Sequence, residues 1–134
     1  MKVNEEIRAM VAAYCRTIMN IKEIFDSYKP VTQESSIYEQ ADASAKKSSA
    51  YHYEGYLNGL ALGIQIVSGV YFSAPNFYLS KETKLDEMKI VVSWTDEKFI
   101  FHAGDYAISN IIKHGYEGAY EAADELIAFV NEAN

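Results

Sequence analysis

Residues 4–28 carry the pattern that most restricts the fold of this chain. Seven apolar or aromatic residues recur there at alternating spacings of four and three residues. This period is that of a helix that packs one side against a partner helix. Asn4 can cap the start of the helix, and Pro30 stops it because the residue before a proline is disfavoured in the helical region. The seam consists of Ile7, Val11, Tyr14, Ile18, Ile21, Phe25 and Tyr28.

A second long helix is predicted for residues 36–69. Ser36 and Glu39 have the spacing of a capping box at its start. Its second half repeats the alternating spacing, so the two seams are expected to pack as an antiparallel helical hairpin across the short connection 30–35. A second copy of the chain is the alternative partner for the first seam. The second seam consists of Tyr53, Leu57, Leu60, Ile64, Val67 and Tyr71.

The second helix also carries glycines every four residues, at Gly55, Gly59 and Gly63. Each glycine costs a helix about 1 kcal/mol relative to alanine, so a close contact is expected along this stripe. The contact could be made within one chain, across the two-fold axis of a homodimer, or with a ligand or partner in a shallow groove. Because the stripe lies beside the seam rather than on it, the helix is predicted to have two contact faces, and we predict a homodimer.

The third predicted element is a β-hairpin over residues 88–104. Two alternating segments flank the polar residues 95–98, and Phe99 and Phe101 point to one side of the second strand. An isolated hairpin is marginal in water. It must therefore pack on the helices, gain a third antiparallel strand from residues 70–79, or pair with another copy.

Two helices are predicted at the C-terminal end. Asp105 is expected to cap a helix over residues 105–114, which Gly115 ends. Residues 118–132 have a clean amphipathic pattern and form the last helix. The fold class is therefore α+β, with a long antiparallel helical hairpin, a β-hairpin and two C-terminal helices, in a single domain over residues 1–134.

Charge limits the partners that the chain can bind. The formal net charge is −7, of which residues 68–134 contribute −6. A protein that binds a phosphate backbone needs a basic surface, so direct nucleic-acid binding is disfavoured. The chain has only two arginines, Arg8 and Arg16, which also argues against bidentate phosphate recognition.

The sequence predicts a cytoplasmic protein. Cys15 is the single cysteine, so the fold does not depend on an intramolecular disulfide. The amino-terminal residues include acids where a signal peptide would have its apolar core. Residues 55–80 contain no charge, but polar residues and Pro75 interrupt them, so no membrane span is expected.

Few residues suggest catalytic chemistry. His52, His102 and His114 have no partner at the spacing of a metal motif. Cys15 lies in the middle of the first helix beside Tyr14, where a thiol is usually buried and inert. The glycine spacing does not match a phosphate-binding loop. We therefore predict no enzyme activity, no catalytic residue, no metal and no cofactor.

Two groups of residues are candidates for binding a partner. The last helix carries a carboxylate stripe that is either a solvated face or a surface for a basic protein, such as a nucleic-acid-binding protein. An aromatic cluster on the second helix offers large contact area at low entropic cost. The acidic candidates are Glu117, Glu121, Asp124 and Glu125, and the aromatic cluster consists of Tyr51, His52 and Tyr56.

The predicted function is that of a small acidic, non-enzymatic interaction protein. It would act as a homodimer that binds a macromolecular partner stoichiometrically, as an inhibitor or accessory protein of the kind encoded by viruses and mobile elements. The alternative is a protein that sequesters a small ligand in a pocket lined by Tyr51, Tyr56 and Phe77, with the loop 72–80 enclosing it. A third possibility, an enzyme that uses tyrosine, histidine and carboxylates, is the least favoured.

Overall fold

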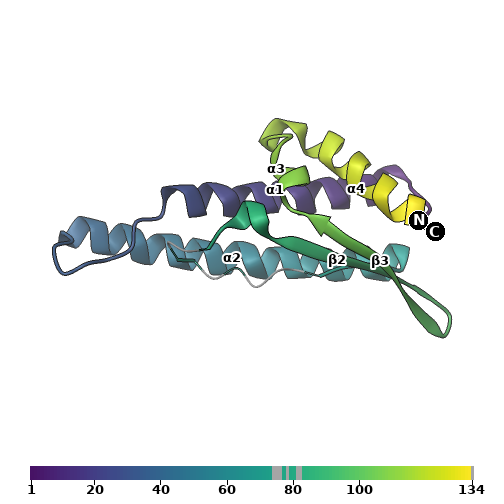
Figure 1. Cartoon of the computed structure of the whole chain (residues 1–134), viewed down its shortest axis with the longest axis horizontal. Coiled ribbons are helices and arrows are strands. Elements are labelled where there is room, and N and C mark those ends of the chain that lie inside the picture. Colours follow the sequence, from purple (N-terminus) through teal and green to yellow (C-terminus); the bar gives the residue numbers. More distant parts are fainter. Residues whose placement is uncertain (74–76, 78, 81–82, 134) are drawn as a thin grey trace.

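Two long helices, a small sheet and a C-terminal helix make up the α+β fold (Figure 1). The computed structural model describes residues 1–73, 77, 79–80 and 83–133. The predicted fold class is confirmed, and residues from the 70–79 segment supply the third strand. The elements are α1 (Glu5–Ser27), α2 (Ile37–Ser68), β1 (Val70–Phe72), η1 (Leu85–Glu87), β2 (Lys89–Asp96), β3 (Phe99–Ala107), α3 (Ser109–Ile112), η2 (Tyr116–Gly118) and α4 (Ala119–Ala133).

Helix α1 forms as its periodicity predicts. The Asn4 side-chain oxygen accepts a hydrogen bond from the Ile7 backbone N–H at 2.8 Å, which caps the first turn. The seam from Ile7 to Ile21 is buried, and Phe25 is partly buried at its end. Helix α2 lies beside α1 in the antiparallel hairpin (Figure 1). The first seam therefore packs within the chain.

Helix α2 is longer than its partner and is only partly covered by it. Ser36 and Glu39 make the predicted capping box. Leu57 and Ile64 of the predicted seam are buried, but Val67 is 50% exposed. Tyr71 lies in β1 and not on the helix, because the helix ends at a left-handed glycine and the following residues alternate as a strand.

The sheet is antiparallel in the order β1-β2-β3. Strand β1 pairs with residues 92–94 of β2, and β2 pairs with β3 along its length. The strands extend to Asp96 and Phe99, so Glu97 and Lys98 form a turn shorter than the predicted four-residue loop. The hairpin lies across the two long helices, and its tip reaches beyond them (Figure 1).

One predicted helix is largely wrong. Asp105 does not cap a helix over 105–114, because it pairs with Val91 and β3 continues to Ala107. Only Ser109–Ile112 is α-helical there, and its start has no side-chain cap. Gly115 has a positive φ of 72°, but its ψ of 168° lies outside the left-handed helical region, so the predicted left-handed cap is also wrong. The strand register prevails over the local capping signal.

One core joins the layers. The rings of Tyr14 on α1 and Phe72 on β1 are 5.3 Å apart, and both side chains are fully buried. Leu126 and Val130 bring α4 onto the same core. Helix α4 lies along α1 on the side away from α2 (Figure 1). This arrangement leaves one side of α2 without a helix against it.

Candidate interaction surfaces

The outer face of α2 is an exposed stripe that runs the length of the helix. Nine exposed residues recur on it at alternating spacings of three and four residues, which is again the period of a helix that packs on a partner. Large residues lie at the ends, where Tyr38 is 84% and Ile66 is 75% exposed. The outer face consists of Tyr38, Ala41, Ala45, Ser48, His52, Gly55, Gly59, Leu62 and Ile66.

Charged side chains avoid this outer face. Every residue of α2 is described, and none of its five charged residues shares the positions of the stripe. Lys46 illustrates where they lie instead, since it donates a hydrogen bond to the Ser27 carbonyl on the α1 side and pairs with Asp42 at 2.8 Å. A solvated helix face usually carries charge, so an uncharged one indicates a contact surface.

The three glycines of the predicted stripe have different surroundings. A Cβ atom at Gly63 would lie 2.9 Å from the Met10 Cε atom, so Gly63 admits a side chain of α1. At Gly55 and Gly59, no described heavy atom outside the helix lies within 4 Å of that position. Packing within the chain therefore accounts for one of the three glycines, and self-association through the other two stays a prediction.

The aromatic cluster of α2 is also exposed. Tyr51 and Tyr56 are 73% and 54% exposed, and His52 is exposed between them with its ring 5.7 Å from that of Tyr53. Tyr53 is half-buried against the core, as expected. Tyr51, His52 and Tyr56 are therefore accessible to a partner, and the prediction that they bind one stands.

The pocket expected for a small ligand is only partly present in the described residues. Tyr51 and Phe77 line a hollow of about 150 Å³ together with Lys47, Ala50 and Leu79. Tyr56 is not among its lining residues. Ligand pockets usually measure about 300–1,000 Å³, so this hollow is small for an organic ligand. Part of the loop 72–80 that was expected to enclose the ligand lies outside the described residues.

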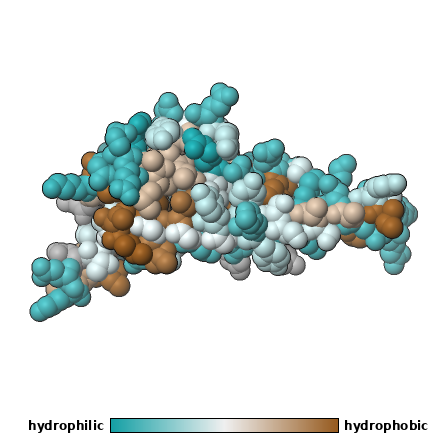
Figure 2. Space-filling view, turned by 180° about the vertical axis from the view of Figure 1, so that it is seen from behind, coloured by the Kyte–Doolittle hydropathy of each residue, from teal (hydrophilic) through white to brown (hydrophobic). Residues whose placement is uncertain are grey.

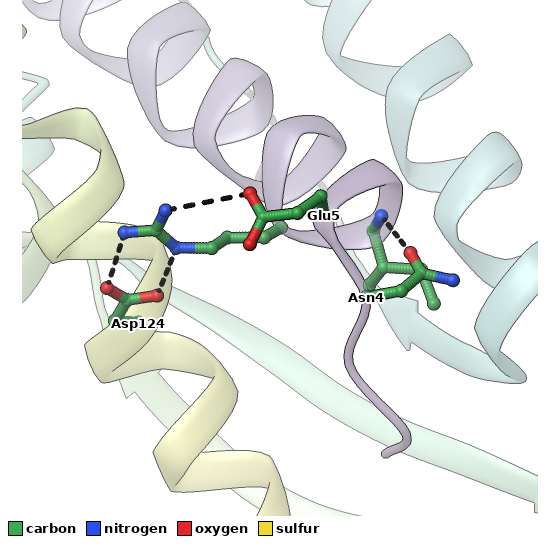
Figure 3. Close-up of polar contacts among 5 residues, drawn as sticks. Asn4, Glu5 and Asp124 are labelled. Carbon is green, nitrogen blue, oxygen red and sulfur yellow. Dashed lines mark hydrogen bonds and ion pairs between the residues drawn. The ribbon is translucent and has the colours of Figure 1, made fainter.

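Half of the predicted acidic surface is engaged by the chain itself. Asp124 on α4 receives two hydrogen bonds from the Arg8 guanidinium, at 2.8 and 3.0 Å (Figure 3). These bonds hold the pKa of Asp124 below its usual value. The same guanidinium is 4.0 Å from Glu5 and lies over the Tyr120 ring. Asp124 therefore fastens α4 to α1.

Glu125 has a similar structural role. Its carboxylate accepts a hydrogen bond from Lys113 at 2.9 Å, and its second oxygen lies 2.6 Å from Nε2 of His114. Both contacts lower the pKa of Glu125. The other two carboxylates predicted to bind a partner are Glu117 and Glu121. Both are exposed, and among the described residues neither has an ion pair like those of Asp124 and Glu125. Binding of a partner by these two carboxylates stays a prediction.

The sequence did not indicate a third surface, the aromatic end of the β-hairpin. Phe99 and Ile100 are 66% and 78% exposed beside the turn, and Phe101 is 41% exposed. Phe101 stacks on the half-buried Trp94, with ring centroids 5.3 Å apart. The alternation had predicted only that the two phenylalanines share one side of the second strand. Strand β1 has only three residues, so it reaches no further than Trp94 and leaves the hairpin end open.

The cysteine and histidine side chains that could act in catalysis or metal binding have ordinary structural surroundings. Cys15 is fully buried, and burial raises the pKa of its thiol to about 12. His102 lies 3.9 Å from Asp105 at the surface of β3. Within the described ranges, no three His, Cys, Asp or Glu side chains are placed to hold a metal ion. No described helix is both long enough and apolar enough to cross a membrane.

Comparisons with protein-family models, with curated proteins and with solved structures gave no match.

Proposed function

We propose that this chain is a non-enzymatic interaction protein that acts as a homodimer and binds a macromolecular partner stoichiometrically. The observation that supports the proposal is the exposed aromatic end of the β-hairpin. Phe99, Ile100 and Phe101 are all exposed at one end of the molecule. Contiguous exposed apolar side chains mark interaction sites, and aromatic residues supply much of the binding energy of interfaces.

The hairpin end has the properties of a preformed binding surface. The stacking of Trp94 on Phe101 joins it to the core, because Trp94 packs against buried residues. The ring of Phe99 lies 6.4 Å from that of Phe101 and extends the row toward the turn. A surface held by strand pairing loses little conformational entropy on binding, which favours affinity.

Charge adds a preference for the kind of partner. The net charge of −7 and the exposed Glu117 and Glu121 would accelerate association with a basic protein. The contribution is to the rate of association rather than to the strength of the final contact. A basic nucleic-acid-binding protein is one partner of this chemistry.

The test changes the hairpin end and measures stoichiometric binding. Tagged wild-type chain is incubated with an extract of the native host, and the molar ratio of each recovered protein is determined by quantitative mass spectrometry. A partner should be recovered at a fixed ratio. The double variant Phe99→Ser and Ile100→Ser should lower that recovery at least tenfold while leaving the unfolding temperature nearly unchanged, because both side chains are exposed.

Tyr116→Ser provides the matched control, because Tyr116 is a 55% exposed aromatic residue far along the chain from the hairpin. It should leave the recovery of the partner unchanged. Equal recovery by the hairpin variant and by wild type would refute the assignment of this surface. Loss of recovery in both variants would point to a general change in the fold.

A further inference from the structure

We infer that the partner adds an extended segment of its own chain to the open edge of β3, as a fourth strand of the sheet. The inference rests on the proposed function, in which the hairpin end binds a macromolecular partner, and it adds the way in which that partner is held. Backbone hydrogen bonds would hold the segment, and the exposed side chains beside the edge would select it. Three observations support it: unpaired backbone groups, an edge without protection, and apolar side chains next to it.

Strand β3 is an edge of the sheet. It pairs with β2 on one side, and no described residue pairs with its other side. None of the backbone hydrogen bonds that join turns, loops and caps among the described residues involves residues 99–107. An unpaired strand edge presents a row of N–H and C=O groups, and the natural occupant of such a row is another extended chain.

The sheet register shows which way the backbone groups of β2 point. In an antiparallel sheet, successive residues of a strand direct these groups alternately toward the two neighbouring strands. The Thr95 N–H donates to the Gly69 carbonyl at 3.0 Å, on the β1 side of β2. The Val91 carbonyl accepts from the Ser73 N–H at 2.9 Å on the same side. Val91, Ser93 and Thr95 therefore direct their backbone groups toward β1 and away from β3.

Ile100 and His102 are the residues of β3 whose backbone groups face outward. Ile100 lies opposite Thr95, and His102 lies opposite Ser93. Because Thr95 and Ser93 do not bond to β3, the N–H and C=O groups of Ile100 and His102 point away from β2. These two residues therefore offer their N–H and C=O groups to an added strand. Beyond His102 the register shifts, and Gly104 has a φ of 129°, so the regular edge ends there.

This edge lacks the features that usually prevent strand addition. Natural edge strands are very short, or they carry lysine, another charged residue or proline. The other edge strand of the sheet, β1, has only three residues. Residues 99–104 contain neither a charged residue nor a proline. An edge of this kind invites uncontrolled pairing unless a specific chain covers it, which favours a binding role.

Apolar side chains lie on both sides of the edge. Phe99 and Phe101 alternate onto one side together with Trp94, on which Phe101 stacks, and Ile100 lies on the other side. Figure 2 shows apolar surface beside the hydrophilic tip of the hairpin, at the lower left. An added strand would lie about 4.8 Å from β3, so its side chains would contact these residues. The segment should therefore carry apolar residues at alternate positions, next to the two phenylalanines.

The first experiment compares two substitutions at His102, which is exposed. His102→Pro removes the outward N–H, whereas His102→Val keeps it, and both remove the imidazole. Proline is tolerated in an edge strand where its N–H would face solvent, so both variants should unfold at nearly the same temperature. Binding is measured with a library of random peptides displayed on phage, and with the host extract used for the hairpin end.

The two variants should bind differently. Wild-type chain should select peptides in which apolar and polar residues alternate. Synthetic copies of these peptides should bind His102→Pro at least tenfold more weakly than His102→Val, and recovery of the partner from the extract should follow the same order. Equal binding by the two variants would overturn the inference. So would selected peptides without alternation, or the absence of any selected peptide.

Amide hydrogen exchange tests the edge without relying on the proline variant. In dilute wild-type chain, the outward amides of Ile100 and His102 should exchange at least tenfold faster than the Phe101 amide, which faces β2. A bound peptide from the selection should slow both outward amides at least tenfold. Slow exchange of both amides in the free chain, or no change on binding, would contradict strand addition. Protection that rises with the concentration of the chain alone would assign the edge to a second copy and overturn the inference.

The outcomes separate this inference from the proposed function. The double variant Phe99→Ser and Ile100→Ser tests the side chains of the hairpin end, whereas the His102 pair tests its backbone. If the double variant lost the partner while both His102 variants recovered it equally, only strand addition would be wrong. If the double variant recovered the partner as wild type does, the hairpin assignment would fail, and this inference would fail with it.

Discussion

Replacing Gly59 with alanine should stabilise the isolated chain. Alanine is better than glycine in a helix by about 1 kcal/mol. The added methyl group meets no described atom outside the helix within 4 Å, so neither a clash nor a packing gain alters this value. Gly55 has the same surroundings, and the double variant should gain roughly 2 kcal/mol because the two sites share no packing partner.

The gain is measured by thermal unfolding followed by circular dichroism at two protein concentrations. At high dilution, each substitution should raise the unfolding temperature by about 4 °C. At high concentration the gain should shrink or reverse, because the methyl groups would separate α2 helices that pair through these glycines, and a dimer stabilises the folded state by mass action. Gly63→Ala is the control, since its methyl group would displace the Met10 side chain and reduce the gain.

Two results would contradict this prediction. If Gly59→Ala lowered stability at high dilution, the inference that a methyl group at this position meets no neighbour would be wrong. The glycine would then be needed within a single chain. If the gain were the same at both concentrations, the glycines would have no part in self-association.

Three further predictions follow from the core and the ion pairs. Leu57→Ala removes a fully buried side chain and should lower the free energy of unfolding by about 2–5 kcal/mol in urea titrations. Tyr106→Phe should leave that free energy unchanged or raise it by about 1 kcal/mol, since the buried hydroxyl has no hydrogen-bond partner among the described residues. Asp124 and Glu125 have lowered pKa values when folded, so their contacts stabilise the chain above the ordinary carboxyl pKa of about 4, and this contribution is lost as the pH falls below it. The double variant Asp124→Asn with Glu125→Gln should therefore be less stable than wild type at neutral pH, and it should lose less stability than wild type on acidification. Each ion pair should contribute below about 1 kcal/mol, because both carboxylates are more than a third exposed.

The parts of the fold that follow from local periodicity could be predicted from the sequence. The seam of α1 determines which side is buried, and the capping box places the start of α2 at Ser36. The hairpin follows from strand alternation on both sides of a polar turn. The helix expected after Asp105 could not be separated from a longer strand, because the pairing of Asp105 with Val91 depends on the sheet register.

The candidate surfaces were less predictable because they depend on what covers each residue. Phe99 and Phe101 alternate along one strand, but Phe99 lies beside the turn of a hairpin whose tip reaches beyond the long helices (Figure 1), and it is 66% exposed. Asp124 looked free on the acidic side of α4, yet its partner Arg8 lies 116 positions away in the chain. The sequence predicts two contact faces for α2 but does not show that Gly63, and not Gly55 or Gly59, is the glycine that meets a side chain of α1.

Gly69 connects the β-hairpin to α2 so directly that the two are expected to rotate together rather than independently. Its left-handed conformation joins the helix directly to β1, and its carbonyl accepts a hydrogen bond from the Thr95 backbone N–H at 3.0 Å. In a homodimer, each copy would present its own hairpin end, joined in this way to its own α2. Two such ends on one assembly would favour targets that repeat the same feature, because binding at the second end would follow intramolecularly at a high effective concentration.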